Sequence, residues 1–474
     1  KSCFARSESS ILSSPTRIMK LSRYNNLLEL FNFQFNNQDP KDIFLKSLKN
    51  LENKFTWEQT FNCIQKLSYE LGIILNKDDR CLLISENRPE WLISDLAIML
   101  ANGITVPAYT TYTERDYEYI INDCEPSVII VSDQSQYNKI DLIIKKKDFI
   151  KKIISFDQIK SNHQDIINIK KIFENENYTK KNFDKLELKR SDMACIIYTS
   201  GTQGEPKGVM LSHGGILNNC EGSFNLLKEI ISSKPKFLTW LPLSHSYEHT
   251  VQFVQIAVGA EIFYAESIDK LIKNMSECGP DIMTAVPRFY QNLHQKINSN
   301  FNKAKGIKKF LINNTIKLGT KNLLKKKTSF LENIIQKICD HTVRKKIKAQ
   351  FGGSLKAFIS GGGALDQEVG KFLNAIGLPT LQGYGLTETS PVVSCNLITD
   401  IKIDTVGPPF SGNEVKIADD GEILIKGENV MLGYWNNQKE TDNVLKDGWL
   451  HTGDIGHFDN NHDIKITDRK KDIL

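Results

Sequence analysis

Residues 196–211, IIYTSGTQGEPKGVML, place hydroxyl groups, glycines and one lysine directly after an apolar run that predicts a strand. A loop of this composition, between a strand and an expected helix, can turn backbone N–H groups, hydroxyls and Lys207 onto an anion such as phosphate. The pattern G-x-x-x-x-G-K-[ST] is absent, because Pro206 stands where its second glycine belongs and Gly208 where its Ser or Thr belongs. The segment therefore predicts a phosphate loop of another kind, or a surface turn rich in small residues.

Three consecutive glycines, Gly361, Gly362 and Gly363, follow a second predicted strand in LKAFISGGGAL. They would let a flat base lie against bare backbone, or they would simply form a tight turn. A dinucleotide fingerprint starting at Gly361 needs a third glycine where this chain has Asp366, so a Rossmann cofactor is not supported.

A third predicted strand leads into GYGLTETS, residues 383–390. Tyr384 offers a ring face, Thr387 a hydroxyl group and Glu388 a hard oxygen ligand that suits Mg²⁺. Further along, HTGD ends in Asp454, whose carboxylate can accept two hydrogen bonds from a vicinal diol such as that of ribose. Taken alone, Asp454 is more typical of a turn residue than of a ribose ligand.

The elements that must position these residues alternate between strands and helices. Residues 80–110 and 128–132 predict strand, helix and strand in succession, which is typical of a parallel sheet covered on both faces. The same alternation of strands and helices resumes at residue 194. Residues 133–190, rich in Asn, Lys and Ile, are interpreted as surface decoration. Loops that follow parallel strands meet at one edge of the sheet, so we expect the three polar loops to converge on one crevice.

After residue 405 the pattern changes to β-hairpins, one turning at Asp420-Gly421 and one within FDNNHDIKI. The predicted fold is therefore α/β: a large N-terminal domain with mixed or parallel sheets between helices, plus a small β-rich subdomain. We expect the boundaries to be an upstream or disordered segment 1–18, α/β subdomains 19–404 with a basic helical insertion at 303–348, the β-rich subdomain 405–467 and a terminal stub 468–474.

Composition limits the class of protein. The 474 residues exceed what one core usually organises, and 40% apolar residues with a mean hydropathy of −0.32 describe a soluble globular chain without a membrane-spanning run. The nine cysteines are scattered without a C-x-x-C pair, which predicts reduced thiols and a cytoplasmic setting. Residues 1–18 lack an apolar signal region; we interpret them as sequence upstream of a start at Met19, with a transit peptide as the alternative.

The net charge of +5 conceals a strong asymmetry. Residues 303–348 hold thirteen Lys and one Arg against Glu332 and Asp340, a local balance of +12 that leaves −7 for the remainder. Only two aromatic residues interrupt this segment, so nucleic acid is not expected as a partner. Leu331, Ile334, Ile335 and Ile338 share one helical face, which predicts either peripheral docking on an anionic membrane or a merely solvated helical hairpin.

In this order, the motifs closely resemble those of the AMP-forming acyl-adenylate enzymes, the superfamily of acyl-CoA synthetases, beetle luciferases and peptide-synthetase adenylation domains. The resemblance is carried by YTSGTQGEPKGV, SGGGAL, GYGLTET, WLHTGD and ITDRKKD, and extends from about residue 55 to the last residue. Gln203 departs from the usual Thr, so we assign its side chain no phosphate role.

The resemblance implies a role for each matching residue. Lys207, Thr387 and Glu388 would be catalytic, with Thr387 on the α-phosphate and Glu388, with Thr199, on Mg²⁺. Asp454 and Arg469 would bind the ribose, and Lys471 would be the hinge to a C-terminal domain. The remaining residues expected to contact the nucleotide are Thr199, Ser200, Gly201, Thr202, Gly204, Gly361, Gly362, Gly363, Tyr384 and Gly385.

The segment LPLSHSYEHTVQF, residues 241–253, resembles the part of the family that lines the acyl pocket, with His245 and Ser246 at the wall. A histidine satisfied within the core is the alternative for His245. Amino-acid-activating relatives usually carry Asp where this chain has Ser246, so a fatty or aryl acid is favoured as the substrate. The amino-acid sequence of the segment most resembles that of the long-chain fatty acid synthetases.

The implied reaction activates a long-chain fatty acid with ATP and Mg²⁺, giving acyl-AMP and pyrophosphate, and then transfers the acyl group to coenzyme A. The alternatives are an acyl-AMP ligase that loads a carrier protein and an inactive relative that binds nucleotide or lipid. In the family a C-terminal domain of roughly 100 residues follows the hinge. We therefore expect this chain to be a poorly active fragment, and its oligomeric state stays open.

Overall fold

The computed structural model describes residues 21–161, 166–183, 186–199 and 205–470. Segment 1–18 and the expected site residues Ser200, Gly201, Thr202, Gly204 and Lys471 lie outside the described residues.

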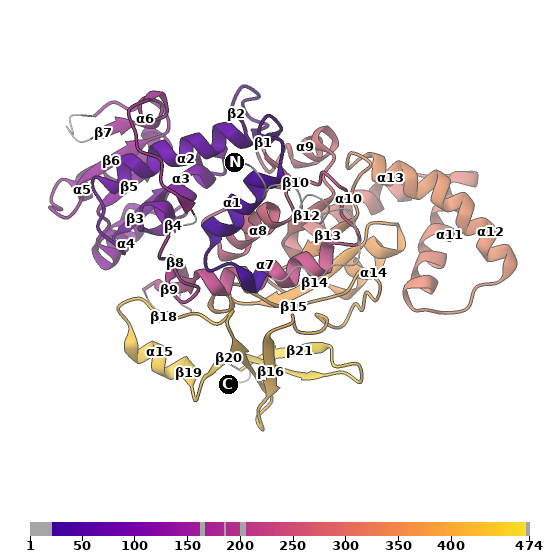
Figure 1. Ribbon diagram of the computed structural model, residues 1–474. Helices are drawn as coiled ribbons and strands as arrows, with labels where there is room; N and C mark the ends of the chain where they lie inside the picture. Colours follow the sequence, from indigo (N-terminus) through magenta and orange to yellow (C-terminus); the bar gives the residue numbers. More distant parts are fainter. Residues whose placement is uncertain (1–20, 162–165, 184–185, 200–204, 471–474) are drawn as a thin grey trace, which may run out of the picture.

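The first sheet contains the strand that precedes the phosphate loop, and all its strands except β18 are coloured indigo to magenta in Figure 1. Its strand order is β18-β9-β8-β4-β3-β5-β6-β7, parallel from β8 to β7 and antiparallel at β9 and β18. Apolar runs such as VIIV are buried on both faces, as a parallel sheet requires. The strands are β3 Arg80–Ile84, β4 Ile104–Ala108, β5 Val128–Val131, β6 Lys152–Ser155, β7 Ile166–Asn168, β8 Met193–Thr199, β9 Lys207–Ser212 and β18 Gly433–Tyr434.

The second sheet provides the other two predicted strands of the site. Its order is β15-β14-β13-β12-β10-β11-β1-β2, parallel from β14 to β1 with an antiparallel strand at each edge. The strands are β1 Ile43–Ser47, β2 Lys54–Thr56, β10 Lys236–Thr239, β11 Glu261–Tyr264, β12 Ile282–Ala285, β13 Ala357–Ser360, β14 Thr380–Gly385 and β15 Val392–Cys395.

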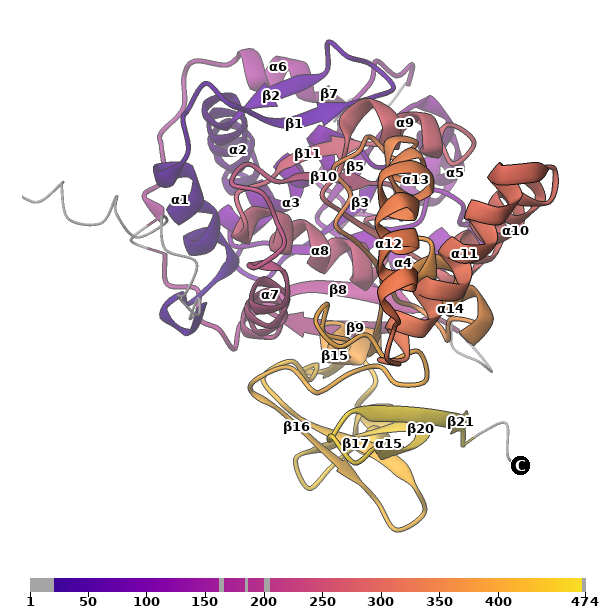
Figure 2. The ribbon, with the colours of Figure 1, turned by 90° about the vertical axis from the view of Figure 1, so that its right-hand side faces the viewer.

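Helices separate and flank the two sheets (Figures 1 and 2). α3 Pro89–Leu100 and α8 Ser246–Ala257 are buried at every residue, and one apolar core joins them to strands of both sheets. The other helices of the sheet layers are α1 Leu27–Asn37, α2 Trp57–Gly72, α4 Glu114–Cys124, α5 Gln134–Ile144, α6 Ile169–Glu174, α7 His213–Leu227, α9 Leu271–Cys278, α10 Pro287–Asn302 and α14 Gln367–Ala375.

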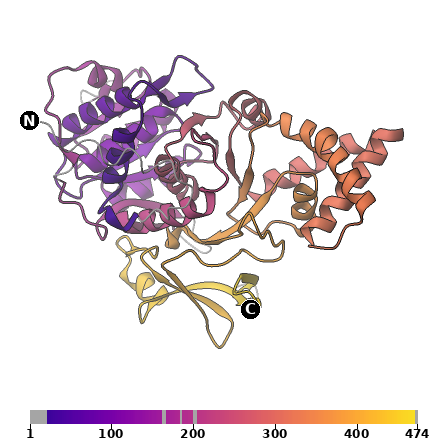
Figure 3. The same cartoon turned by 45° about the vertical axis from the view of Figure 1, so that its right-hand side comes forward.

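Two additions complete the molecule. The first is a helical hairpin of α11 Gly306–Leu323 and α12 Phe330–Cys339, followed by α13 Lys345–Ala349, which forms the right-hand end in Figure 1 and stands away from the rest in Figure 3. The second is a small antiparallel sheet, yellow in Figure 1, in the order β16-β17-β20-β19 with β21 on β20. Its elements are β16 Asn413–Ile417, β17 Glu422–Gly427, α15 Gln438–Val444, β19 Leu445–Lys446, β20 Trp449–Phe458 and β21 Ile464–Arg469.

The α/β architecture, both hairpins of the third sheet and the helix at Leu331–Ile338 were predicted and are present. Two local predictions are wrong. A strand follows the phosphate loop, because the alternating run KGVMLS pairs antiparallel with β8, and the helix α7 begins only after Ser212, which caps it. Residues 133–190 are more than surface decoration, because the isoleucine-rich runs at β6 and β7 extend the first sheet.

Candidate active site

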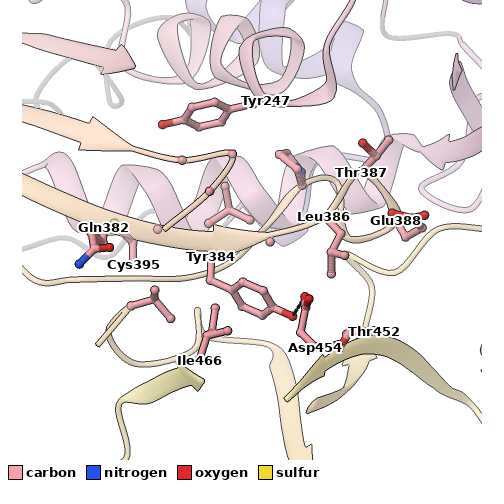
Figure 4. A pocket seen from close by; sticks show the side chains of 18 of the residues that line it. Tyr247, Gln382, Tyr384, Leu386, Thr387, Glu388, Cys395, Thr452, Asp454 and Ile466 are labelled. Carbon is pink, nitrogen blue, oxygen red and sulfur yellow. Dashed lines mark hydrogen bonds between the residues drawn. The ribbon is translucent and has the colours of Figure 1, made fainter. Parts of the chain in front are cut away.

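A cavity of about 1430 Å³ lies where the loops after β13 and β14 face the third sheet. Its wall includes Thr199 and Lys207 from β8 and β9. Figure 4 shows part of this wall, with Thr387 and Glu388 from the turn after β14 and Asp454 from the third sheet. Every described residue of the predicted site lines this cavity: Thr199, Lys207, His245, Ser246, Gly361, Gly362, Gly363, Tyr384, Gly385, Thr387, Glu388, Asp454 and Arg469.

The glycine turn after β13 lies against the ring of Tyr247. A Cβ atom at Gly361 would come within 2.9 Å of the ring atom Cζ of Tyr247, and Gly362 has a φ of +75°, a conformation that other residues rarely adopt. The Tyr247 hydroxyl donates a hydrogen bond of 3.1 Å to the carbonyl oxygen of Ile359 and fixes this ring beside the turn. Glycine is therefore required here to bring bare backbone to the cavity wall.

Asp454 is the centre of a hydrogen-bonded group at the cavity floor. Its Oδ2 accepts a 2.8 Å bond from the Tyr384 hydroxyl, drawn in Figure 4, and its Oδ1 accepts a 3.0 Å bond from Nε of Arg469. Burial and the neighbouring Asp454 carboxylate raise the pKa of Tyr384, so its hydroxyl stays a donor at neutral pH. Asp454 is buried while Arg469 is exposed, so a carboxylate is held in place next to an accessible cation.

Thr387 and Glu388 lie in a 3₁₀ turn that directly follows β14. The turn is held close to the chain that returns as β15, because a Cβ at Gly385 would lie 1.7 Å from the carbonyl oxygen of Pro391. Thr387 Oγ1 is 3.1 Å from Oγ of Ser246, which links the turn to the start of α8. Both side chains thus reach the cavity from a rigid backbone.

Lys207 and Glu388 are connected through residues that the sequence analysis did not identify. The Lys207 ammonium group forms an ion pair with Glu440 of α15 and lies 5.1 Å from the centre of the Tyr434 ring. The Tyr434 hydroxyl in turn donates a 2.8 Å hydrogen bond to Oε1 of Glu388. Tyr434 reaches this position because β18 pairs with β9, and no local sequence pattern indicates that long-range pairing.

A magnesium ion fits this end of the cavity as a companion of nucleotide phosphates. Within the described ranges, no cluster of three or more His, Cys, Asp and Glu could hold a metal ion alone. Mg²⁺ usually binds one or two protein oxygens together with phosphate oxygens and water. The Glu388 carboxylate and the Thr199 hydroxyl at the cavity wall are oxygen ligands of that kind.

His245 occupies the cavity wall and also begins α8. Its Nδ1 accepts a 3.1 Å hydrogen bond from the backbone N–H of Tyr247, so it acts as the N-cap of the helix. The surrounding protein lowers the pKa of the imidazole by desolvation, which favours the neutral ring. His245 is exposed on the cavity wall and is therefore not a core histidine, although its ring satisfies a backbone group; its role in an acyl pocket stays a prediction.

The opposite end of the cavity is apolar. Its wall includes Leu226, Leu227, Phe237, Val251, Val254 and Ile282. Thr284 also lines it and donates a 2.8 Å hydrogen bond to Glu248, a carboxyl group that is completely buried. Burial raises the pKa of Glu248 to about 8, so this acid is protonated at neutral pH.

Comparison with known sequences shows the family to which the chain belongs. The AMP-binding enzyme family matches residues 33–435, so the chain belongs to the AMP-binding enzymes. It is 33% identical to fatty acyl-CoA synthetase A of Dictyostelium discoideum over 87% of this chain and 64% of that protein. It is 30% identical to long chain acyl-CoA synthetase 3 of Arabidopsis thaliana over 88% of this chain and 66% of that protein. The chain thus spans about two thirds of the length of these relatives.

Solved structures share the fold. The anthranilate CoA ligase AuaEII in complex with anthranoyl-AMP superimposes with a TM-score of 0.73 at 20% identity, covering 96% of this chain and 80% of that one. The N-terminal domain of FACL13 from Mycobacterium tuberculosis gives a TM-score of 0.72 at 18% identity, covering 94% of this chain and all of that one. The chain therefore shares its fold with the N-terminal domain of FACL13 and with most of AuaEII.

Proposed function

We propose that this chain carries the nucleotide and acyl sites of an AMP-forming long-chain fatty acid–CoA ligase. The observation that carries the proposal is a single cavity with Lys207, Thr387, Glu388 and Asp454 at one end and an apolar wall at the other. A nucleotide and an alkyl chain need these two environments side by side. The names of the similar acyl-CoA synthetases support the same substrates.

In the proposed reaction, a carboxylate oxygen of the fatty acid attacks the α-phosphorus of ATP, and the bond to pyrophosphate breaks. Lys207 and Thr387 would donate hydrogen bonds to the phosphates where negative charge develops, and Asp454 with Arg469 would hold the ribose. Mg²⁺, held by Glu388 and Thr199, would neutralise phosphate charge. The thiol of coenzyme A would then displace AMP from the acyl carbon.

The proposed division of the chain follows the sequence expectations, with the α/β subdomains at 19–404, the β-rich subdomain at 405–467 and Lys471 in a hinge. One strand crosses the proposed boundary: β18, residues 433–434 of the β-rich subdomain, pairs with β9 of the first sheet. This pairing holds the β-rich segment next to β9, which begins at Lys207. We call the part of the cavity around Lys207, Thr387 and Glu388 the phosphate end, because the phosphates would bind there.

The proposed setting is cytoplasmic, with peripheral contact to an anionic membrane through the lysine-rich segment 303–348. Long-chain acids partition into bilayers, so contact would bring the enzyme to its substrate. Among the described helices, none is long and apolar enough to cross a membrane.

The proposal is tested by fatty-acid-dependent exchange of labelled pyrophosphate into ATP, which reports adenylate formation without a need for coenzyme A. We expect palmitate to stimulate exchange by this chain weakly, and more than an amino acid or an aryl acid does. ATP binding without exchange for any acid would favour the inactive relative. Exchange followed by transfer to a carrier protein, with no thioester formed from coenzyme A, would favour the carrier-loading ligase.

A further inference from the structure

The hairpin of α11 and α12 exposes apolar side chains to an unusual extent. Of the fourteen large apolar side chains that are exposed in the described part of the chain, seven lie between Ile307 and Ile338. Figure 2 looks onto this end of the molecule, where α11 and α12 are in front, and Figure 3 shows them projecting from the sheets. A soluble protein rarely concentrates exposed apolar surface in one place without a partner for it.

The exposed side chains lie on two helices that contact each other. Leu331, Ile334 and Ile338 follow each other at i, i+3 and i+7 on one face of α12 and are 70%, 44% and 46% exposed. Ile307 and Phe310, in the first turns of α11, are 80% and 57% exposed. We call these five residues the apolar face.

The two helices that carry the apolar face pack against each other. Cys339, at the end of α12, is buried, and its thiol lies 3.6 Å from the carbonyl oxygen of Leu311, which follows Phe310. The end of α12 therefore lies against the beginning of α11. Phe310 and Ile338 are the neighbours of these two residues in the chain, so each part of the apolar face lies within one residue of the contact between the helices.

Positive charge surrounds the apolar face. Segment 303–348 has a charge balance of +12, and exposed lysines cluster in the loop between the helices and in α13. In the described part of the chain, ion pairs to carboxylates involve only three of its fourteen cations: Lys321, Lys325 and Arg344. Most of the charge is thus available to an external anion.

We infer that the apolar face and the lysines around it bind the surface of an anionic lipid bilayer. Apolar side chains beside cations match the acyl boundary and the headgroups of such a surface. A second copy of this chain would bring two strongly positive faces together, so like charges oppose that pairing. The inference deepens the proposed membrane contact by naming its surface, and it does not depend on ligase activity.

The test is co-sedimentation of the 474-residue chain with vesicles of phosphatidylcholine, alone or mixed with phosphatidylserine. We expect binding only to the mixed vesicles, and weaker binding at about 1 M salt than at about 0.1 M, because the screening length falls from about 10 to about 3 Å. Each lysine near an anionic surface strengthens binding by roughly fivefold. Changing Lys326, Lys327, Lys345 and Lys346 to Gln should therefore weaken binding at least tenfold.

A matched control changes four exposed lysines elsewhere, Lys49, Lys77, Lys146 and Lys170, to Gln and should bind like the unchanged chain. A second variant, with Leu331, Ile334 and Ile338 changed to Gln, should also bind more weakly. All these side chains are exposed, so thermal melting should stay the same.

Equal binding by the lysine variant and its control would overturn the inference, as would equal binding to neutral vesicles. A concentration-dependent dimer that the same substitutions abolish would assign the face to a second copy instead. None of these outcomes involves catalysis, so a failed exchange assay with successful vesicle binding would reject the ligase and keep the docking surface.

Discussion

Carboxyl groups have different surroundings and partners at the two ends of the cavity. At the phosphate end, Asp454 is bonded to Arg469, Glu440 to Lys207 and Glu388 to a tyrosine hydroxyl. Behind the apolar end, Glu248 is bonded to Thr284, its Oε1 has no hydrogen-bond partner among the described residues, and its pKa is about 8. Charge is stabilised where phosphates and a metal ion would bind, and it is removed where an alkyl chain would pack.

The largest effect that we expect tests the apolar end. The pKa of Glu248 rises from 4.5 to about 8 on folding, so between these values the folded state keeps a proton that the unfolded state has lost. The stability of the wild type must therefore fall as pH rises through this window. Glu248→Gln can keep the bond from Thr284 and removes the titration. From pH 5.5 to 8 the free energy of unfolding of the variant should gain about 3 kcal/mol relative to wild type.

Urea denaturation at several pH values measures this difference. A useful control is Glu229→Gln, since Glu229 is an exposed acid that follows α7. Parallel pH profiles for wild type and Glu248→Gln would mean that Glu248 is ionised in the folded protein, and the contrast between the two ends would then fail.

At the phosphate end, Glu388→Gln should reduce Mg²⁺-dependent pyrophosphate release roughly a hundredfold or more, measured in a longer chain that carries a C-terminal domain after the hinge. An amide keeps the shape and can still accept the bond from Tyr434, but it cannot supply the negative charge that a hard cation needs. Tyr434→Phe, which removes only the hydrogen bond, should cost much less. Near-normal release by Glu388→Gln would reject the metal assignment.

Asp454→Asn should raise the Kd for ATP about tenfold and affect the maximal rate less, because the ribose is distant from the bond that breaks. The amide loses the charge that faces Arg469 and presents one oxygen in place of two. Isothermal titration with ATP and with a ribose-lacking pyrophosphate ligand separates the effects: only ATP should bind more weakly. Equal losses for both ligands would show that the substitution disturbs the whole cavity.

The sequence predicted the fold well where local periodicity determines it. The strands β8, β13 and β14 and the two hairpins were identifiable because buried apolar runs end in glycine or polar turns. The rule that loops at one edge of a sheet converge accounts for the loops after β13 and β14, which are neighbours in the second sheet, whereas β8 belongs to the first sheet and its end reaches the same cavity because the two sheets pack together. That rule depends on the sheet order, which repeated strand-helix-strand patterns strongly constrain.

Residues that enter the cavity through long-range pairing could not be predicted. Tyr434 and Glu440 come from a segment more than 200 residues after Lys207, and they reach it because β18 is added to the edge of the first sheet beside β9. The burial of Glu248 could not be predicted either, since the polar sequence SYEHT does not indicate that every residue of α8 is buried. Each of these depends on tertiary packing, which local patterns do not encode.

Glu440 gives the smallest and most specific prediction. Its carboxylate pairs with Lys207, the cation expected to contact ATP phosphates, and this hydrogen bond lowers the pKa of Glu440. ATP must therefore compete with Glu440 for Lys207. Both side chains are about one-third exposed, at 31% and 33%, so solvent screens the pair and its contribution is at most about 1 kcal/mol. Glu440→Gln should lower the Kd for ATP by about two- to fivefold, as titration calorimetry would measure.

The matched control is Asp442→Asn, which removes the same charge from an exposed position of the same helix. If the effect came only from the general field near the cavity, both substitutions would strengthen ATP binding alike. If Lys207 is held by direct pairing, only Glu440→Gln should do so, and the gain should shrink as salt screens the pair. Weaker ATP binding by Glu440→Gln would reverse the interpretation, because Glu440 would then position Lys207 for the phosphates rather than compete with them.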